Sequence, residues 1–113
     1  MADDLADRQC VPCRGDVPKL GGAELQQLAA RLPRWQVVED HHLERKYKFP
    51  DFVSALAFVN RVGAVAEEQG HHPDIYLTWG KVKIKVFTHT LDGLSESDFV
   101  LGAKIERLFT APL

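Results

Sequence analysis

The stretch PDFVSALAFVNRVGAVAEEQG, residues 50–70, carries the clearest secondary-structure signal in the chain. Its apolar residues recur every three or four positions, which predicts one amphipathic helix. Asp51 is suited to cap the start of this helix, and Gly70 is suited to end it in the left-handed conformation. The predicted inward stripe comprises Phe52, Ala55, Leu56, Val59, Val62 and Ala66. The rest of the chain must supply the layer that covers this stripe.

Two pairs of strand candidates flank this helix. Residues 34–40 and 42–49 are expected to form one hairpin, with His41 and His42 as exposed turn residues. Residues 74–79 and 81–89 are expected to form a second hairpin around Gly80. Helices are predicted over residues 22–32 and 94–109, and Ser95 and Asp98 have the spacing of a capping box. The order α-β-β-α-β-β-α predicts an α+β fold in which three helices cover one face of a four-stranded, mostly antiparallel sheet.

Length and composition predict one globular domain. The chain has 113 residues, of which 45% are hydrophobic and 27% are charged. We place the domain at residues 22–113, behind an irregular lead-in at residues 1–21. The net charge of −2 gives no overall attraction to nucleic acid or to acidic membranes. The N-terminus does not resemble a secretion signal, and no apolar run approaches the ~20 residues of a membrane helix. We therefore expect a cytoplasmic protein with neither membrane nor nucleic-acid partners.

The two cysteines, Cys10 and Cys13, form a single C-x-x-C in a segment rich in proline and glycine. A structural zinc usually needs four ligands, and a thioredoxin-like pair would follow a strand. We therefore expect an incidental reduced pair, with metal binding or redox chemistry as the alternative.

The strand predicted at residues 81–89 alternates apolar residues with lysines, so one face should meet the helices and the other should remain open. The open face would carry Lys81, Lys83, Lys85, Phe87 and His89. The lysines fit a solvated sheet face or, alternatively, a surface that assists an anionic ligand. Trp79, just before the turn, fits either the core or a cleft.

Directly after the central helix, His71 and His72 stand between Gly70 and Pro73. They could line one wall of a cleft whose other wall carries His89. Adjacent side chains diverge and lack the one-turn spacing usual for zinc ligands, which argues against a metal site. Acid–base catalysis suits imidazole, whose pKa lies near neutrality, and Glu67 one turn earlier could fix its tautomer. A helix C-terminus also favours histidine electrostatically without any chemical role. Catalysis and a plain turn both remain open at this point.

The order and spacing of these residues resemble a known signature. The chain reads Glu67, three residues, His71-His72-Pro73, five residues, Trp79, nine residues, His89, eight residues and Asp98. This resembles the pterin-4a-carbinolamine dehydratases, spacing included, and segments 45–67 and 88–106 are similar to that family as well. The likeness spans residues 23–108, and the predicted element order matches the family's fold. The lead-in CVPCRG is similar to bacterial members, whereas Gly70 replaces an acidic residue of animal members.

The resemblance implies a lyase that dehydrates 4a-hydroxytetrahydropterin, a by-product of aromatic amino acid hydroxylases, to quinonoid dihydropterin and water. This step supports tetrahydrobiopterin recycling, and the family uses no metal and no cofactor. By position, His71 and His89 are implied to transfer protons, and His72 to assist catalysis through ring contacts. The implied substrate-binding residues are Glu67, which could orient His71 or contact the pterin, Pro73, Trp35 and Asp98. The helix cap predicted at Asp98 is a complete alternative explanation of that residue.

The family implies a homodimer or homotetramer, which the exposed edges of a four-stranded sheet also favour. The alternative function is a non-enzymatic binding module. Animal members are dimerisation cofactors of a homeodomain transcription factor, and related domains are assembly chaperones for a carbon-fixing enzyme. All three motif histidines are retained here, which favours catalysis. A metal-binding domain built from Cys10, Cys13 and histidines is the third hypothesis.

Overall fold

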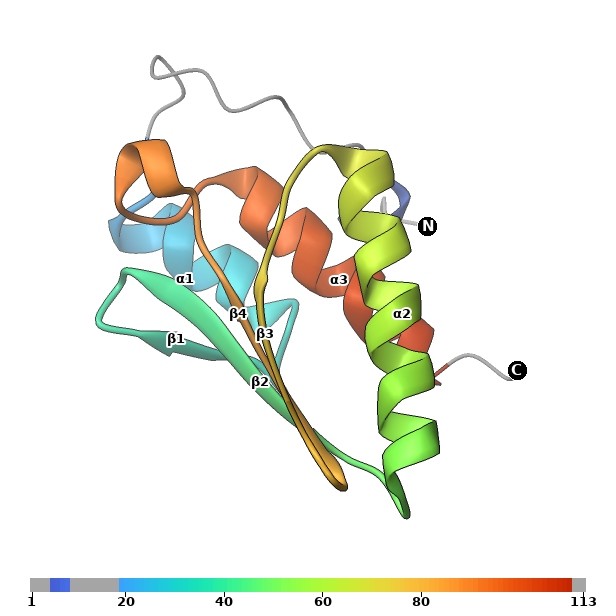
Figure 1. Cartoon of the computed structure of the whole chain (residues 1–113). Coiled ribbons are helices and arrows are strands. Elements are labelled where there is room, and N and C mark those ends of the chain that lie inside the picture. The colour runs from blue at the N-terminus through green and yellow to red at the C-terminus, as the bar shows by residue number, and fades with distance from the viewer. Residues whose placement is uncertain (1–4, 9–18, 111–113) are drawn as a thin grey trace.

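The computed structural model describes residues 5–8 and 19–110. The elements follow the order η1 (Leu5–Asp7), α1 (Gly22–Ala30), β1 (Gln36–Val38), β2 (His42–Lys48), α2 (Phe52–Gln69), β3 (Asp74–Thr78), β4 (Lys81–Val86), η2 (His89–Leu91) and α3 (Glu96–Thr110) (Figure 1). This order confirms the predicted α+β fold with three α-helices and four strands. Cys10 and Cys13 lie outside the described residues, so their predicted role stays a prediction.

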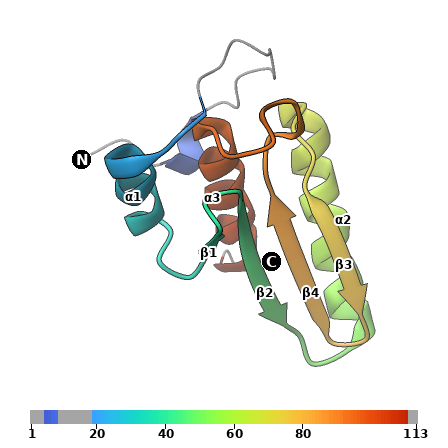
Figure 2. The same cartoon turned by 90° about the vertical axis from the view of Figure 1, so that its left-hand side faces the viewer.

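The four strands form one sheet in the order β1-β2-β4-β3, and every neighbouring pair is antiparallel. The α-helices α2 and α3 pack on one face of the sheet, and α1 packs against α3. The opposite face is turned toward the viewer in Figure 2, where none of the described helices covers it. The α-helices therefore form one layer and the sheet the other, with the hydrophobic core between them.

The face that each strand turns to the core follows from its alternation. Val82, Ile84 and Val86 of β4 are fully buried, as are Leu43 and Tyr47 of β2. The register places Leu43 opposite Val86 and Tyr47 opposite Val82, so the two strands present one apolar surface to the helices. The predicted lysine face of β4 is accordingly the open face of the sheet.

Helix α2 begins and ends where the sequence predicts. The Asp51 side chain accepts a hydrogen bond from the Ser54 backbone N–H at 2.8 Å, and this bond lowers the pKa of Asp51 below its ordinary value. At the other end Gly70 adopts φ 64° and ψ 28°, the left-handed conformation. Local signals at both ends were sufficient to define this helix.

The buried stripe of α2 differs from the predicted one. Ala55, Val62 and Ala66 are buried as expected. Phe58 is buried as well, although the predicted stripe did not include it. Phe52 and Leu56 are instead 42% and 39% exposed. The phase of a helix rich in apolar residues is set by which positions meet α3 and the sheet, and this was not readable from spacing alone.

The lead-in is not irregular throughout. Leu5 and Ala6, within η1, are buried, and η1 packs against α3. The Lys104 ammonium donates a hydrogen bond to the Ala6 carbonyl at 2.8 Å. Among the described residues, no helix is long and apolar enough to cross a membrane.

Candidate active site

Three segments that are distant in sequence meet at one end of the sheet. They are the residues after α2, the end of β4 with η2, and the start of α3, all of which lie near the top of Figure 1. His71 and His72 come from the first, His89 from the second and Asp98 from the third. The hydrogen bonds described below join the first and third segments through a single carboxylate.

The end of α2 places its two histidines. The Gly70 backbone N–H donates to the carbonyls of Ala66 and Glu67, and the N–H of His71 donates to the Ala66 carbonyl at 3.2 Å. Such bonds are typical of a helix closed by a left-handed residue. The half-buried Pro73 then leads into β3. His71 and His72 follow the helix directly, with backbones fixed by its last turn.

His71 is buried, with 8% of its surface exposed, and its Nε2 lies 2.6 Å from Asp98 Oδ1. A carboxylate only accepts hydrogen bonds, so a proton on Nε2 is the arrangement that satisfies both groups. The other ring nitrogen, Nδ1, is then the one that carries a lone pair and can accept a proton. An imidazole whose tautomer is held by a buried carboxylate is the arrangement used by histidine general bases.

Asp98 is fully buried and serves α3 as well as His71. Its Oδ2 accepts hydrogen bonds from the Ser95 backbone N–H and the Thr88 hydroxyl, both at 2.8 Å. In the bond from Ser95, the side chain of the third helical residue, Asp98, accepts from the backbone N–H of the cap residue, which is one half of a capping box. The sequence predicted this capping box. The predicted cap is therefore confirmed on one oxygen, and the other oxygen contacts His71, which the sequence did not predict. A contact between Asp98 and substrate stays a prediction.

Thr88 was not predicted as a site residue. Its hydroxyl also lies 3.0 Å from that of Ser95, and the threonine is 3% exposed. The signal was present in the alternation of β4, because Thr88 continues the inward series of Val82, Ile84 and Val86. A polar residue at an inward position needs a buried partner, and here the partner is Asp98.

His72 is exposed and its Nε2 pairs with Glu67 Oε2. The two residues are five positions apart, across the end of α2. The expectation that Glu67 orients His71 is therefore wrong: Asp98 contacts His71, and Glu67 contacts His72. A substrate contact by Glu67 or by His72 stays a prediction.

His89, the first residue of η2, is exposed on the open side of the sheet. Its ring lies 4.2 Å from that of Phe87, and the ring of His41 packs on Phe87 at 4.7 Å. The end of β4 is connected to both histidines: Thr88 donates a hydrogen bond to Asp98, the partner of His71, and His89 is the next residue in the chain. His71 is buried against Asp98, whereas His89 is exposed.

The predicted exposure of His41 and His42 is wrong, because both are half-buried. His41 Nε2 lies 2.7 Å from Asp92 Oδ1, and the Nδ1 atoms of His41 and His42 are 3.0 Å apart. The hydrogen bond from His41 lowers the pKa of Asp92. Burial lowers the pKa of His42, and the charges of Lys85 and His41 lower it further. The β1–β2 turn thus folds over the strand end that carries His89.

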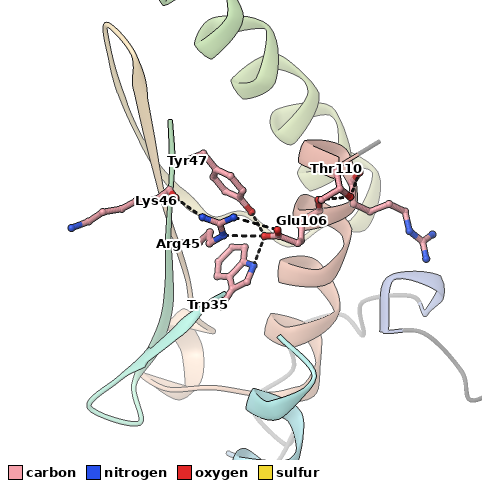
Figure 3. A network of polar contacts seen from close by, with 7 residues as sticks. Trp35, Arg45, Lys46, Tyr47, Glu106 and Thr110 are labelled. Atoms are coloured by element: carbon pink, nitrogen blue, oxygen red, sulfur yellow. Dashed lines mark hydrogen bonds and ion pairs between the residues drawn. The ribbon is translucent and has the colours of Figure 1, made fainter. Parts of the chain in front are cut away.

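Trp35 is not brought to the histidines. It is 6% exposed, and its Nε1 donates to Glu106 Oε1 at 3.1 Å (Figure 3). Arg45 and Tyr47 donate to the same carboxylate, and the Arg45 guanidinium lies 4.1 Å from the Tyr47 ring centre. This cluster, which we call the Glu106 cluster (Trp35, Arg45, Tyr47 and Glu106), links β2 and the residue just before β1 to α3. It accounts for Trp35 as a structural residue.

The part of the chain that the structure describes holds no group of three or more histidine, cysteine, aspartate or glutamate side chains placed to bind one metal ion. What the site offers is two imidazoles, one buried with its tautomer fixed and one exposed. Such a pair can take a proton from one position of a ligand and deliver one to another.

Comparisons with known proteins agree on one family. The sequence profile described as "Pterin 4 alpha carbinolamine dehydratase" matches residues 18–108. A protein of Rubrobacter xylanophilus, named as a candidate pterin-4-alpha-carbinolamine dehydratase, is 59% identical over 93% of this chain and 98% of its own length. A protein of Alkaliphilus metalliredigens with the same name is 49% identical over 93% of this chain and 96% of its own.

Two solved structures are also similar. The transcriptional coactivator/pterin dehydratase of Brucella melitensis has a TM-score of 0.76 at 27% identity, covering 80% of this chain and 98% of its own. A pterin dehydratase-like protein identified as a RuBisCO assembly factor in the alpha-carboxysome has a TM-score of 0.57 at 25% identity. That likeness covers 70% of this chain and 90% of the other.

Proposed function

Since this chain belongs to the pterin-4-alpha-carbinolamine dehydratase family, we propose that it dehydrates 4a-hydroxytetrahydropterin to quinonoid dihydropterin and water by histidine acid–base catalysis. The observation that carries the catalytic part is the buried bond between His71 and Asp98. A binding module has no need of a buried imidazole with a fixed tautomer. Retention of this pair favours the enzyme over the non-enzymatic alternative.

The reaction needs two proton transfers. The bond between C4a and the hydroxyl oxygen breaks, the oxygen leaves as water after it gains a proton, and a ring nitrogen gives one up. In our proposal His71 Nδ1 accepts the nitrogen's proton, because Asp98 on Nε2 stabilises the resulting imidazolium. His89, on the exposed side, delivers the proton to the leaving oxygen. Neither role requires a metal or a cofactor.

His72 and Glu67 would form the outer rim of the site, where their pair can orient a polar pterin edge. Pro73 would hold the loop that carries both histidines. In our proposal the product re-enters tetrahydrobiopterin recycling downstream of an aromatic amino acid hydroxylase. The protein would act in the cytoplasm, as a homodimer or homotetramer.

The deciding experiment measures dehydration of 4a-hydroxytetrahydropterin above its spontaneous rate. We expect His71→Ala and His89→Ala each to lower kcat by about a hundredfold or more. Thr78→Ala, exposed at the other end of the sheet, is the control and should keep the wild-type rate. A wild type no faster than the spontaneous reaction refutes the dehydratase. Active enzyme with unchanged histidine variants refutes the site instead.

A further inference from the structure

The lysines of the open sheet face are the one sequence feature that the proposed reaction leaves unused. Lys46 of β2 lies directly opposite Lys83 of β4, and Lys48 lies directly opposite Lys81. Tyr47 and Val82, which alternate with these lysines, are buried on the helix side, so the four lysines belong to the opposite face, the one turned to the viewer in Figure 2. We call them the lysine quartet (Lys46, Lys48, Lys81 and Lys83).

Two consecutive pairs of like charge across a sheet are unfavourable in the protein alone. Directly opposed like charges destabilise a strand pair, whereas opposite charges stabilise it. Protection of a sheet edge by lysine can account for Lys46 and Lys48, because β1 pairs only with residues 42–44 of β2. It does not account for Lys81 and Lys83, because β4 is paired with β2 on one side and with β3 on the other. The arrangement is explained if an anion occupies the face.

The surrounding carboxylates neutralise little of this charge. Glu44 Oε1 lies 3.9 Å from Lys83 Nζ, at the limit of an ion pair. None of the described carboxylates pairs with Lys46, Lys48 or Lys81. The quartet therefore keeps most of its positive charge for a ligand.

The same residues border a hollow. A cavity of about 270 Å³ is lined by Lys46, Tyr76, Thr78, Lys81 and Lys83. The Lys83 ammonium lies 4.5 Å from the centre of the Tyr76 ring, which holds that side chain over the hollow. Cross-strand neighbours lie ~5 Å apart and alternate residues along a strand ~7 Å apart, so the long side chains of the quartet can reach one small ligand together.

We propose that the lysine quartet binds a small ligand with two or three linked phosphate groups, with Tyr76 available to stack on a planar ring carried by that ligand. Charge and size both favour this ligand. A short phosphate chain supplies as many negative charges as the quartet has positive ones, and the hollow has the size of a small molecule. The overall charge of −2 favours a compact ligand over a nucleic-acid strand, whose approach depends on a wide positive surface.

The quartet is separate from the histidine site. Lys83, the quartet member of β4 nearest to the histidines, precedes Thr88 by five residues of mostly extended chain, which span roughly 16 Å at ~3.3 Å each. A ligand at the quartet would therefore leave the histidines free, and this inference does not depend on the dehydratase reaction.

Calorimetric titration at ~0.15 M salt tests the proposal with inorganic tripolyphosphate, ATP and a short single-stranded oligonucleotide. We expect tripolyphosphate and ATP to bind, and Lys46→Ser/Lys83→Ser to weaken both by about tenfold or more. Lys19→Ser/Arg34→Ser removes the same charge elsewhere and should change the affinity less than about twofold. No binding of tripolyphosphate, equal weakening in both double variants, or binding of the oligonucleotide alone each overturns the proposal.

Two further readouts guard against a folding defect. Tripolyphosphate should raise the melting temperature of the wild type and leave that of Lys46→Ser/Lys83→Ser unchanged, because only a bound ligand stabilises the fold. The dehydration rate of the same variant should equal that of the wild type. An equal rise in melting temperature in both proteins, or a loss of dehydration in the variant, contradicts a separate phosphate site.

Discussion

Asp98 is the residue on which the site and the fold depend together. Each of its oxygens already faces at least one donor, from His71, Thr88 or Ser95. Asp98→Asn must therefore point an N–H₂ group at one of these donors. We expect a loss of about 1–3 kcal/mol in the free energy of unfolding and a fall of about a hundredfold or more in kcat.

The measurements for this prediction are urea unfolding and the dehydration rate. Glu96→Gln is the matched control, because Glu96 is an exposed carboxylate in the same helical turn and interacts with Arg8. It should change both quantities little. A variant at Asp98 that kept full activity would show that His71 needs no carboxylate behind it.

Glu106 predicts an acid-dependent stability. Burial opposes its ionisation, but hydrogen bonds from Arg45, Tyr47 and Trp35 prevail, and the pKa of Glu106 lies below its ordinary value. A lowered folded-state pKa stabilises the protein above the unfolded-state value, and this contribution is lost as the pH falls through the folded-state value. Ionised Glu106 should therefore stabilise the fold at neutral pH, and this stabilisation should be lost in acid.

The test compares wild type with Glu106→Gln in urea from pH 7 to pH 3. At pH 7 we expect the variant to be less stable by on the order of 2 kcal/mol, because Arg45 loses its charged partner. Below about pH 4.5 the difference should shrink as the wild-type carboxylate protonates. If the difference in the free energy of unfolding between the two proteins stayed constant from pH 7 to pH 3, ionisation of Glu106 would not be the source of the acid dependence.

At the scale of the element, α2 offers two glycines with opposite expectations. Gly70 has φ +64°, so Gly70→Ala should cost about 1–2 kcal/mol and displace the histidines that follow. Gly63 lies inside the helix, and a Cβ there would meet no atom within 4 Å. Gly63→Ala should therefore add roughly 0.5–1 kcal/mol to the free energy of unfolding.

Urea unfolding of the two variants gives the comparison, and the dehydration assay should show a loss for Gly70→Ala alone. Two variants of equal stability would mean that the left-handed end of α2 does not set the position of His71.

The elements also show what the sequence could reveal. The ends of α2 and the inward face of β4 were predictable because caps and alternation are local signals. The partner of His71 was not: Glu67, close along the chain, was favoured, whereas Asp98, 27 positions away, forms the bond. The prediction that His41 is exposed was wrong for the same reason, because its contacts, Phe87 and Asp92, are distant in sequence and come close only in the folded protein. Trp35 was assigned to the site by resemblance, and its burial beside Glu106 depends on how α3 docks.

At the scale of the whole molecule, α2 carries an exposed apolar surface. Phe52, Val53 and Leu56 are 42%, 76% and 39% exposed in the single chain. An apolar surface of this kind on a helix favours association, and a second copy of the chain is the partner that the predicted oligomer requires. We expect light scattering coupled to size exclusion to give a multiple of 12.7 kDa.

Val53→Glu/Leu56→Glu should shift that mass toward the monomer, because it would bury charge at the interface. Gln26→Glu, exposed on α1, adds charge elsewhere and should not. A monomeric wild type, or an unchanged mass for the double variant, would exclude this surface as the interface.

The hydrogen bonds of Asp98 have a consequence for the order of folding events. These bonds join positions 71 and 98, so α2, the β3–β4 hairpin and α3 must all be docked before they can form. Helices and hairpins form locally and fast, whereas contacts between distant segments come later. The reaction rate should therefore recover on refolding only at this last docking step, later than the helical signal. The onset of activity in a newly made chain would therefore mark the end of its folding.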